Sequence, residues 1–175
     1  ERDGVKVLVS RALESNGFTN GFSTRIGGVS DFPKDSLNLA GYDEDSDENI
    51  AENRRRFMNV IGGEFVLASC WQIHSADVRQ VRNVEDAADG DHKMDALVSD
   101  AKGVLLGAKT ADCVPVLVGD PKTGAFSAIH AGWRGTVQSI VVNAIEKMRS
   151  LYDSDPEDLI AAIGPAAGCQ NYEIG

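Results

Sequence analysis

Residues 95–129 read DALVSDAKGVLLGAKTADCVPVLVGDPKTGAFSAI, and this stretch contains four predicted β-strands. Each is a short, mainly aliphatic run bounded by Gly, Pro or Asp, which is typical of strands. The four are Asp95–Ser99, Val104–Leu106, Val114–Val118 and Ala125–Ile129. Asp120–Gly124 joins the last two and predicts a hairpin, because Pro121 presets φ and Gly124 accepts positive φ.

On the C-terminal side of this stretch, apolar residues recur at helical spacing and predict one long helix that begins near Thr136. The apolar stripe consists of Val137, Ile140, Val141, Ala144, Ile145, Met148 and Leu151. We expect this stripe to pack on the sheet and to leave Gln138, Asn143 and Lys147 more exposed. Asp155–Asp158 predicts a capped turn, and Leu159–Ile163 predicts a fifth buried strand.

On the N-terminal side, the pattern predicts a second helix with Asp45 as its N-cap and Gly62-Gly63 at its end. The loose apolar face of this helix consists of Ile50, Phe57, Met58 and Ile61. Further strands are predicted at Val5–Val9, Glu64–Ser69 and Val78–Val84. A loop with short extended pieces is predicted at 17–30, and a loop at 85–94. Because strands outnumber helices and include a hairpin, we predict an α+β fold rather than a doubly wound parallel sheet.

Composition excludes several classes of partner. The 175 residues favour one domain over 1–175. A net charge of −10, from 17 basic and 27 acidic residues, repels phosphate backbones and argues against nucleic-acid binding. No apolar stretch approaches the roughly 20 residues of a membrane helix. Three cysteines make no disulfide framework, so we expect a cytoplasmic protein. As to assembly, we expect a monomer or a weak homo-oligomer. We also expect the domain to be incomplete at its C-terminal end.

With three histidines and three cysteines, the reactive side chains are quickly enumerated. His92 lies in a polar loop, and Cys70 and Cys169 are expected to be structural. The remaining three, each beside the end of a predicted strand, are His74, Cys113 and His130. They could hold a catalytic zinc with a fourth position open. Alternatively, Cys113 could be a nucleophile with His130 as its base, or the three could be unrelated.

Several strings in this sequence match a known family, and the most specific are Thr110–Pro115 (TADCVP) and His130–Gly135 (HAGWRG). Other matching pieces are Gln72 with His74, Asp95–Val98, Phe22–Arg25, Gly27–Ser30, Leu37–Leu39, Glu52–Arg54 and Ile163–Pro165. In these strings the chain resembles the YfiH family, which has been described both as a multicopper polyphenol oxidase or laccase domain and as purine nucleoside phosphorylases. Two departures are Ser75, where relatives usually have Gly, and Ala166, where they commonly have Cys.

The resemblance implies that His74, Cys113 and His130 bind one metal, mostly zinc, with copper as the alternative. We expect all three side chains to converge on one point. The implied reaction is phosphorolysis of adenosine and inosine to ribose 1-phosphate and free base. Adenosine deamination and methylthioadenosine phosphorolysis are associated activities. The implied fold is an α+β layer structure related in outline to bacterial toxin cysteine hydrolases.

Further residues are predicted to contact substrate or assist the reaction. Arg25 and Arg134 could supply the local positive charge that phosphate needs in an acidic protein. Asn38 could hydrogen-bond ribose, and Gln72 is also predicted to bind substrate. Asp112 could shuttle a proton or hold a supporting hydrogen bond, and we favour the hydrogen bond.

Other functions remain open from the sequence. One alternative is a Cys-His hydrolase or amidase that edits peptide-type substrates. Another is a binding module that a metal stabilises without catalysis. A true laccase is the weakest interpretation, because three histidines cannot ligate the four coppers that such an enzyme needs.

Overall fold

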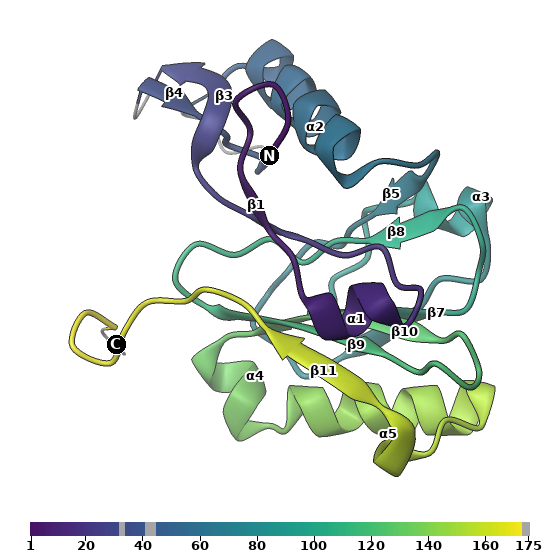
Figure 1. The fold of residues 1–175 in the computed structure, drawn as a ribbon. Helices are drawn as coiled ribbons and strands as arrows, with labels where there is room; N and C mark the ends of the chain where they lie inside the picture. Colours follow the sequence, from purple (N-terminus) through teal and green to yellow (C-terminus); the bar gives the residue numbers. More distant parts are fainter. Residues whose placement is uncertain (32–33, 41–44, 173–175) are drawn as a thin grey trace.

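The computed structural model describes residues 1–31, 34–40 and 45–172 (Figure 1). The helices are α1 (Arg11–Ser15), α2 (Asp47–Ile61), α3 (Val84–Ala87), α4 (Trp133–Val137) and α5 (Ile140–Tyr152), with a 3-10 turn at Pro156–Asp158. The strands are β1 (Val7–Leu8), β2 (Phe22–Ser23), β3 (Ile26–Asp31), β4 (Lys34–Ser36), β5 (Val66–Ala68), β6 (Val78–Gln80), β7 (Ala96–Ser99), β8 (Val104–Leu106), β9 (Val114–Gly119), β10 (Phe126–Ala131) and β11 (Ile160–Ile163). Among the described helices, none is both long and apolar enough to cross a bilayer.

A five-stranded sheet in the order β11-β9-β10-β7-β6 forms the centre of the molecule. All its pairs are antiparallel except β6 with β7, so the predicted α+β class is confirmed. The predicted hairpin joins β9 to β10. Its turn is held by Asp120, whose carboxylate accepts the N–H groups of Lys122 and Thr123, while Gly124 has a φ of 78°.

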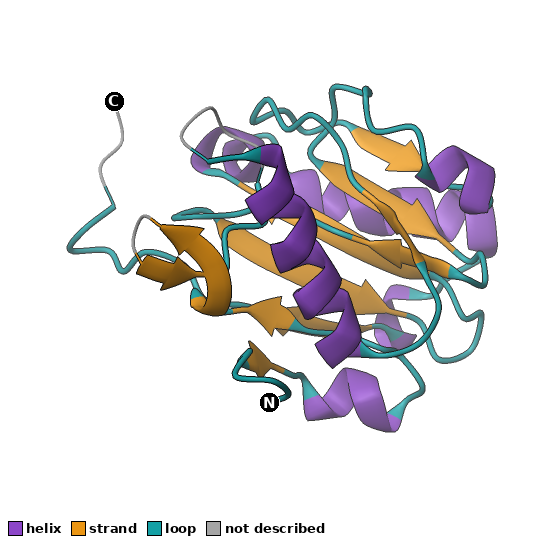
Figure 2. Ribbon diagram, turned by 90° about the horizontal axis from the view of Figure 1, so that it is seen from above, coloured by secondary structure: helices purple, strands orange, loops and turns teal. Residues whose placement is uncertain are grey.

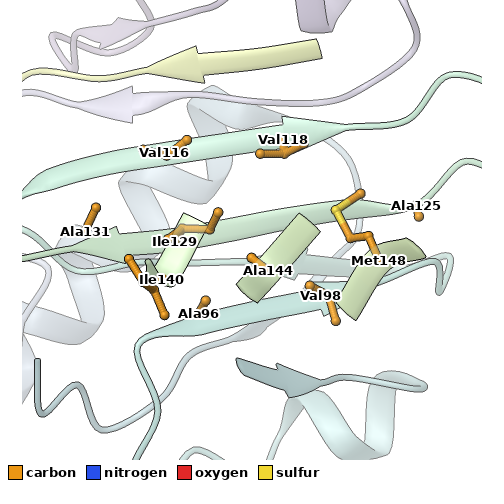
Figure 3. Close-up of a cluster of buried hydrophobic side chains, with 10 residues drawn as sticks. All are labelled: Ala96, Val98, Val116, Val118, Ala125, Ile129, Ala131, Ile140, Ala144 and Met148. Carbon is orange, nitrogen blue, oxygen red and sulfur yellow. The ribbon is translucent and has the colours of Figure 1, made fainter. Parts of the chain in front are cut away.

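The two faces of this sheet build two separate cores, because side chains alternate along each strand. Ala96 and Val98 of β7 face α5, which covers one side of the sheet (Figures 1 and 3). Leu97, between them, faces the second core. That core lies under the parallel pair β5–β8 and includes Ala68, Val104 and Leu106 of those strands. Figure 2 shows α2 crossing on the side of the sheet away from α5.

The single long helix predicted from Thr136 is wrong, because the chain breaks there into α4 and α5. Ser139, between them, adopts a left-handed backbone conformation with a φ of 64°. The break changes the phase of the apolar stripe, and Val137 is 78% exposed. Within α5 the stripe is buried as predicted at Ile140, Ala144 and Met148. The prediction is wrong for its last member, Leu151, which is 38% exposed near the end of the helix. Gln138 and Asn143 are exposed, and Lys147 is half-buried.

The predicted N-cap of α2 is also wrong. Ser46 caps the helix by accepting the N–H of Asn49, and Gly62 ends it as predicted. Asp45 is used otherwise, because its carboxylate accepts hydrogen bonds from Ser30, Asn38 and Asn49. These hydrogen bonds lower the pKa of Asp45, the bond from Ser30 most strongly.

Three smaller expectations need correction. Leu159–Ile163 does not form a fully buried strand, because β11 is an edge strand with alternating exposure and Ile163 is 74% exposed. The predicted strand Val78–Val84 ends at Gln80. The predicted loop 85–94 contains most of α3, which Asn83 caps through the N–H of Asp86.

Candidate metal centre

The connectivity of the central sheet brings distant residues to one edge. Strands β6, β7 and β9 begin at this edge, and β10 and β11 end there, because β10 and β11 are both antiparallel to β9. Asp95 and Cys113 immediately precede β7 and β9, and His74 lies four residues before β6. His130 is the last residue but one of β10. The same edge therefore receives four reactive side chains from four separate chain segments.

The expected convergence of His74, Cys113 and His130 is found. One potential ligand atom from each side chain lies within 4.8 Å of the other two. Cys113 Sγ is 3.8 Å from Nε2 of His74, and the two imidazole rings meet edge to face with centroids 4.9 Å apart. His130 is buried, Cys113 is half-buried and His74 is exposed. The cluster is therefore anchored in the protein on one side and open to solvent on the other.

A buried carboxylate, Asp95, holds two of these residues in place. Its Oδ1 lies 2.8 Å from Nδ1 of His130 and also accepts the N–H of His74 at 2.9 Å. Its Oδ2 accepts the N–H groups of Ile73 and Ser75 and the hydroxyl of Ser75. Burial raises the pKa of Asp95, but the hydrogen bonds from His130, Ser75 and Ile73 outweigh burial and lower it overall. With Nδ1 donating to Asp95, Nε2 of His130 is free to bind a metal.

The local backbone is shaped around the cluster. His74 has a φ of 61°, a conformation that non-glycine residues seldom adopt and that often marks functional sites. A Cβ at Gly132 would lie 2.6 Å from Cδ2 of His74 and 3.3 Å from Sγ of Cys113, so only glycine leaves room for the cluster. A Cβ at Gly135 would approach the carbonyl oxygen of Ser75 to 2.7 Å. This close packing keeps α4 against the segment that carries His74.

The donor set suits a single transition metal. One thiolate and two imidazoles are typical ligands of a catalytic zinc, which keeps a fourth position open. The close approach of the three ligand atoms and the support of His130 by Asp95 both fit such an ion. The third histidine of the sequence, His92, pairs instead with Asp89 at 2.9 Å in an exposed loop. The chain thus has too few histidines for the copper cluster of a laccase.

The residues predicted to bind substrate have varied surroundings. The side-chain amide of Gln72 both donates to and accepts from the backbone of Lys109, which gives it a structural role. Asn38 hydrogen-bonds Asp45 and the N–H of Ala40, within the network at the start of α2. These contacts tie both amides to neighbouring protein groups.

The predicted charged residues are exposed. Asp112 precedes Cys113, and its carbonyl oxygen accepts the N–H of Ala167. Arg134 follows the cluster on α4, with its guanidinium carbon 5.2 Å from the centroid of the Trp133 ring. Arg25 immediately precedes β3 on the exposed surface.

Sequence reasoning misses the roles of three residues at this site. The sequence identifies Asp95 only as the start of a strand and of the family string Asp95–Val98, although a charged residue directly before a buried run is a usable signal. Ser75 supplies a hydroxyl to Asp95. The Tyr172 hydroxyl lies 3.5 Å from Sγ of Cys113. This contact is the largest cause of a raised pKa of Tyr172, and burial is the second. Nothing in the sequence pattern connects Tyr172 with Cys113, because 59 residues separate them.

Comparison with known proteins shows relatives over most of the chain. Residues 19–175 match the family model described as multi-copper polyphenol oxidoreductase laccase. A Deinococcus radiodurans protein named purine nucleoside phosphorylase is 41% identical over 157 residues, which cover 88% of this chain and 58% of that protein. An Escherichia coli protein named purine nucleoside phosphorylase YfiH is 34% identical over 172 residues, covering 97% of this chain and 67% of the relative.

A solved structure is also similar to this chain. YlmD from Geobacillus stearothermophilus superposes with a TM-score of 0.80 at 33% identity, covering 87% of this chain and 59% of YlmD. The chain thus spans roughly six tenths of the length of the relatives that it matches. The family match and these identities agree with the strings TADCVP and HAGWRG. The chain belongs to the YfiH family, whose family model carries the multi-copper polyphenol oxidoreductase laccase description.

Proposed function

We propose that this chain carries the metal centre of a zinc-dependent purine nucleoside phosphorylase that converts adenosine and inosine to ribose 1-phosphate and free base. The observation that carries the proposal is the approach of one thiol and two imidazoles to within 4.8 Å of one another. The names of the Deinococcus and Escherichia relatives support the substrate class.

His74, Cys113 and His130 would hold the zinc. Sulfur and imidazole nitrogen together favour zinc, and the exposed side of the cluster leaves a position for substrate. Zinc bound there would supply Lewis-acid polarisation of a substrate oxygen. Asp95 keeps the His130 ring in one orientation and one tautomer. The glycine at position 132 leaves space beside all three ligands.

Phosphate recognition requires positive charge on a chain whose net charge is −10. Arg134 is well placed for this role, because it lies on α4 two residues after Gly132 and its side chain is exposed. Arg25 is the second proposed source of charge and is also exposed. Both guanidinium groups could bind phosphate oxygens in bidentate fashion. Asp112 would serve as a supporting hydrogen-bond acceptor beside Cys113.

A Cys-His hydrolase is the second candidate, and one observation favours it. Cys113 Sγ lies within hydrogen-bonding distance of His74 Nε2, as a nucleophile and its base would. In such enzymes a third group orients the base itself. Here the orienting carboxylate, Asp95, contacts the ring of His130, which the sequence suggested as the base, whereas the imidazole within hydrogen-bonding distance of the sulfur belongs to His74. This division of roles favours a metal held by both histidines.

The test combines metal analysis with a phosphorolysis assay. We expect about one zinc per chain, and hypoxanthine release from inosine that depends on phosphate and zinc. The Cys113→Ser variant should fold but lose most of its zinc and its turnover, because a hydroxyl is a much poorer zinc ligand. Cys169→Ser is the matched control, since Cys169 is an exposed thiol, and it should retain both.

Chelation separates the alternatives. The metal-free wild type should lose turnover and regain it when zinc is added. The turnover of a cysteine hydrolase would not change with the chelator. A metal-stabilised binding module would lose thermal stability on chelation but show no turnover at any zinc concentration. Adenosine deamination and methylthioadenosine phosphorolysis belong in the same substrate panel. We further propose a cytoplasmic location and a monomeric or weakly homo-oligomeric state. Sedimentation of the purified chain would test the oligomeric state.

A further inference from the structure

The segment after β11 runs back along the loop that carries Cys113. Gly164 donates its N–H to the carbonyl oxygen of Pro115 at 2.9 Å, and Ala167 donates to that of Asp112 at 3.0 Å. These hydrogen bonds fix the segment on both sides of Cys113. Figure 1 shows it in yellow, extending past the end of the sheet from which α4 also leaves.

A turn then directs the chain toward the cysteine. Asn171 donates its N–H to the carbonyl oxygen of Gly168 at 2.9 Å, and Tyr172 follows this turn. The Tyr172 hydroxyl reaches to 3.5 Å from Sγ of Cys113, and both residues are half-buried. Cys113 is therefore approached by two polar groups, an imidazole of the proposed metal site and a phenol.

The chemistry of the two groups sets the direction of the hydrogen bond. A metal-bound cysteine is a thiolate and has no proton to donate. The phenol hydroxyl must then be the donor and the sulfur the acceptor. A hydrogen bond to a metal-bound sulfur withdraws electron density from it, and such supporting contacts tune the metal and fix the orientation of its ligand.

We propose that Tyr172 is a positioning residue of the metal centre, whose hydroxyl donates a hydrogen bond to the Cys113 thiolate and so orients and tunes this ligand. The inference rests on the metal site proposed above. It assigns a role to a segment that lies 59 residues from Cys113 in sequence and supplies none of the three metal ligands.

Cobalt(II) in place of zinc tests this directly, because its sulfur-to-metal charge-transfer band reports on the thiolate. The variant is Tyr172→Phe, which removes only the hydroxyl. Without the hydrogen bond the sulfur is more electron-rich, so the band should shift to lower energy. Cobalt affinity should fall by about 10–100-fold, the usual effect of removing a group that supports a metal ligand.

Tyr152→Phe is the matched control, because Tyr152 ends α5 and packs against the hydrophobic core. It should leave both the band and the cobalt affinity unchanged. An unchanged band and affinity in Tyr172→Phe, with a normal wild-type band, would overturn the role of Tyr172 and leave the metal site intact. A phenolate-to-metal band lost in Tyr172→Phe would make the tyrosine a direct ligand and also overturn it. Absence of any sulfur-to-cobalt band in the wild type would overturn both proposals.

Discussion

Oδ1 of Asp95 lies 2.8 Å from Nδ1 of His130, and both side chains are almost wholly buried. The same carboxylate accepts the backbone N–H groups of His74 and Ser75. One buried anion thus fixes the orientation of the His130 ring and holds the backbone of His74 in place. The left-handed conformation of His74 is supported by these bonds. A change at Asp95 should therefore affect both metal binding and stability.

The Asp95→Asn variant tests this link. An amide offers one oxygen and an NH₂ group where the carboxylate accepted five hydrogen bonds, so buried donors lose their partner. We expect the free energy of unfolding to fall by about 1–3 kcal/mol, the cost of a buried unpaired polar group. Zinc affinity should fall by about 10–100-fold. Urea unfolding of the metal-free protein and competition with a chelator measure the two effects.

The control for this prediction is Asp91→Asn, the same change in an exposed loop. It should leave stability and zinc affinity close to the wild-type values. Normal zinc affinity in Asp95→Asn would show that the carboxylate does not orient the ligands.

Gly132→Ala should separate folding from metal binding. The backbone at 132 has a φ of −68° and a ψ of 163°, which alanine adopts without strain. Its new Cβ would nevertheless lie 2.6 Å from the His74 ring and would displace it. We expect a folded protein whose zinc affinity falls at least about 10-fold. Gly90→Ala, where a Cβ meets only ordinary contacts at 3.9 Å, should bind zinc normally in the same titration. Equal affinities in the two variants would contradict the prediction.

The strands of the central sheet could be predicted from local patterns. Short, mainly aliphatic runs indicated β7, β9 and β10, and Pro121 with Gly124 indicated the hairpin. Strands and turns depend on a few neighbouring residues, so local sequence carries this information. Local pattern alone left open whether His74, Cys113 and His130 meet, and the resemblance to the YfiH family carried that prediction. The structure supplies the physical reason, because the sheet connectivity gathers the strand ends beside these residues at one edge.

Features set by tertiary contact could not be predicted. The apolar spacing runs across Ser139 without interruption, yet the helix breaks there, and α4 packs with Gly135 close to the Ser75 backbone. The role of Asp95 depends on groups 20 to 35 residues away in sequence. Tyr172 reaches Cys113 only through the path of the segment after β11. Each case requires the folded arrangement of segments that are distant in the sequence.

The break at Ser139 predicts an unusual response to substitution. A left-handed conformation costs an L-residue roughly 1–2 kcal/mol, and glycine avoids this cost while gaining entropy when unfolded. We expect Ser139→Gly to raise the free energy of unfolding by up to about 1 kcal/mol, which is a Tm increase of about 2–4 °C. Ser139→Val should lower the stability, because a β-branched side chain fits this conformation poorly. A continuous helix through residue 139 would give the opposite order in thermal unfolding.

The last prediction concerns Cys70, whose thiol is buried and donates to the carbonyl oxygen of Met94. Burial, and then the nearby charge of Asp95, raises the pKa of Cys70 from its ordinary 9.0 to about 11. Between these values the unfolded chain releases the thiol proton while the folded protein retains it. The contribution of Cys70 to stability is therefore complete below pH 9.0 and is lost as the pH rises toward about 11. The slope should be at most about 1.4 kcal/mol per pH unit.

Cys70→Ala removes this titration. We therefore expect the free energy of unfolding of the wild type to fall relative to that of the variant between pH 9.0 and about 11. Urea unfolding under reducing, metal-free conditions measures both values. Parallel stability curves for the two proteins would show that the Cys70 thiol titrates equally in the folded and unfolded states.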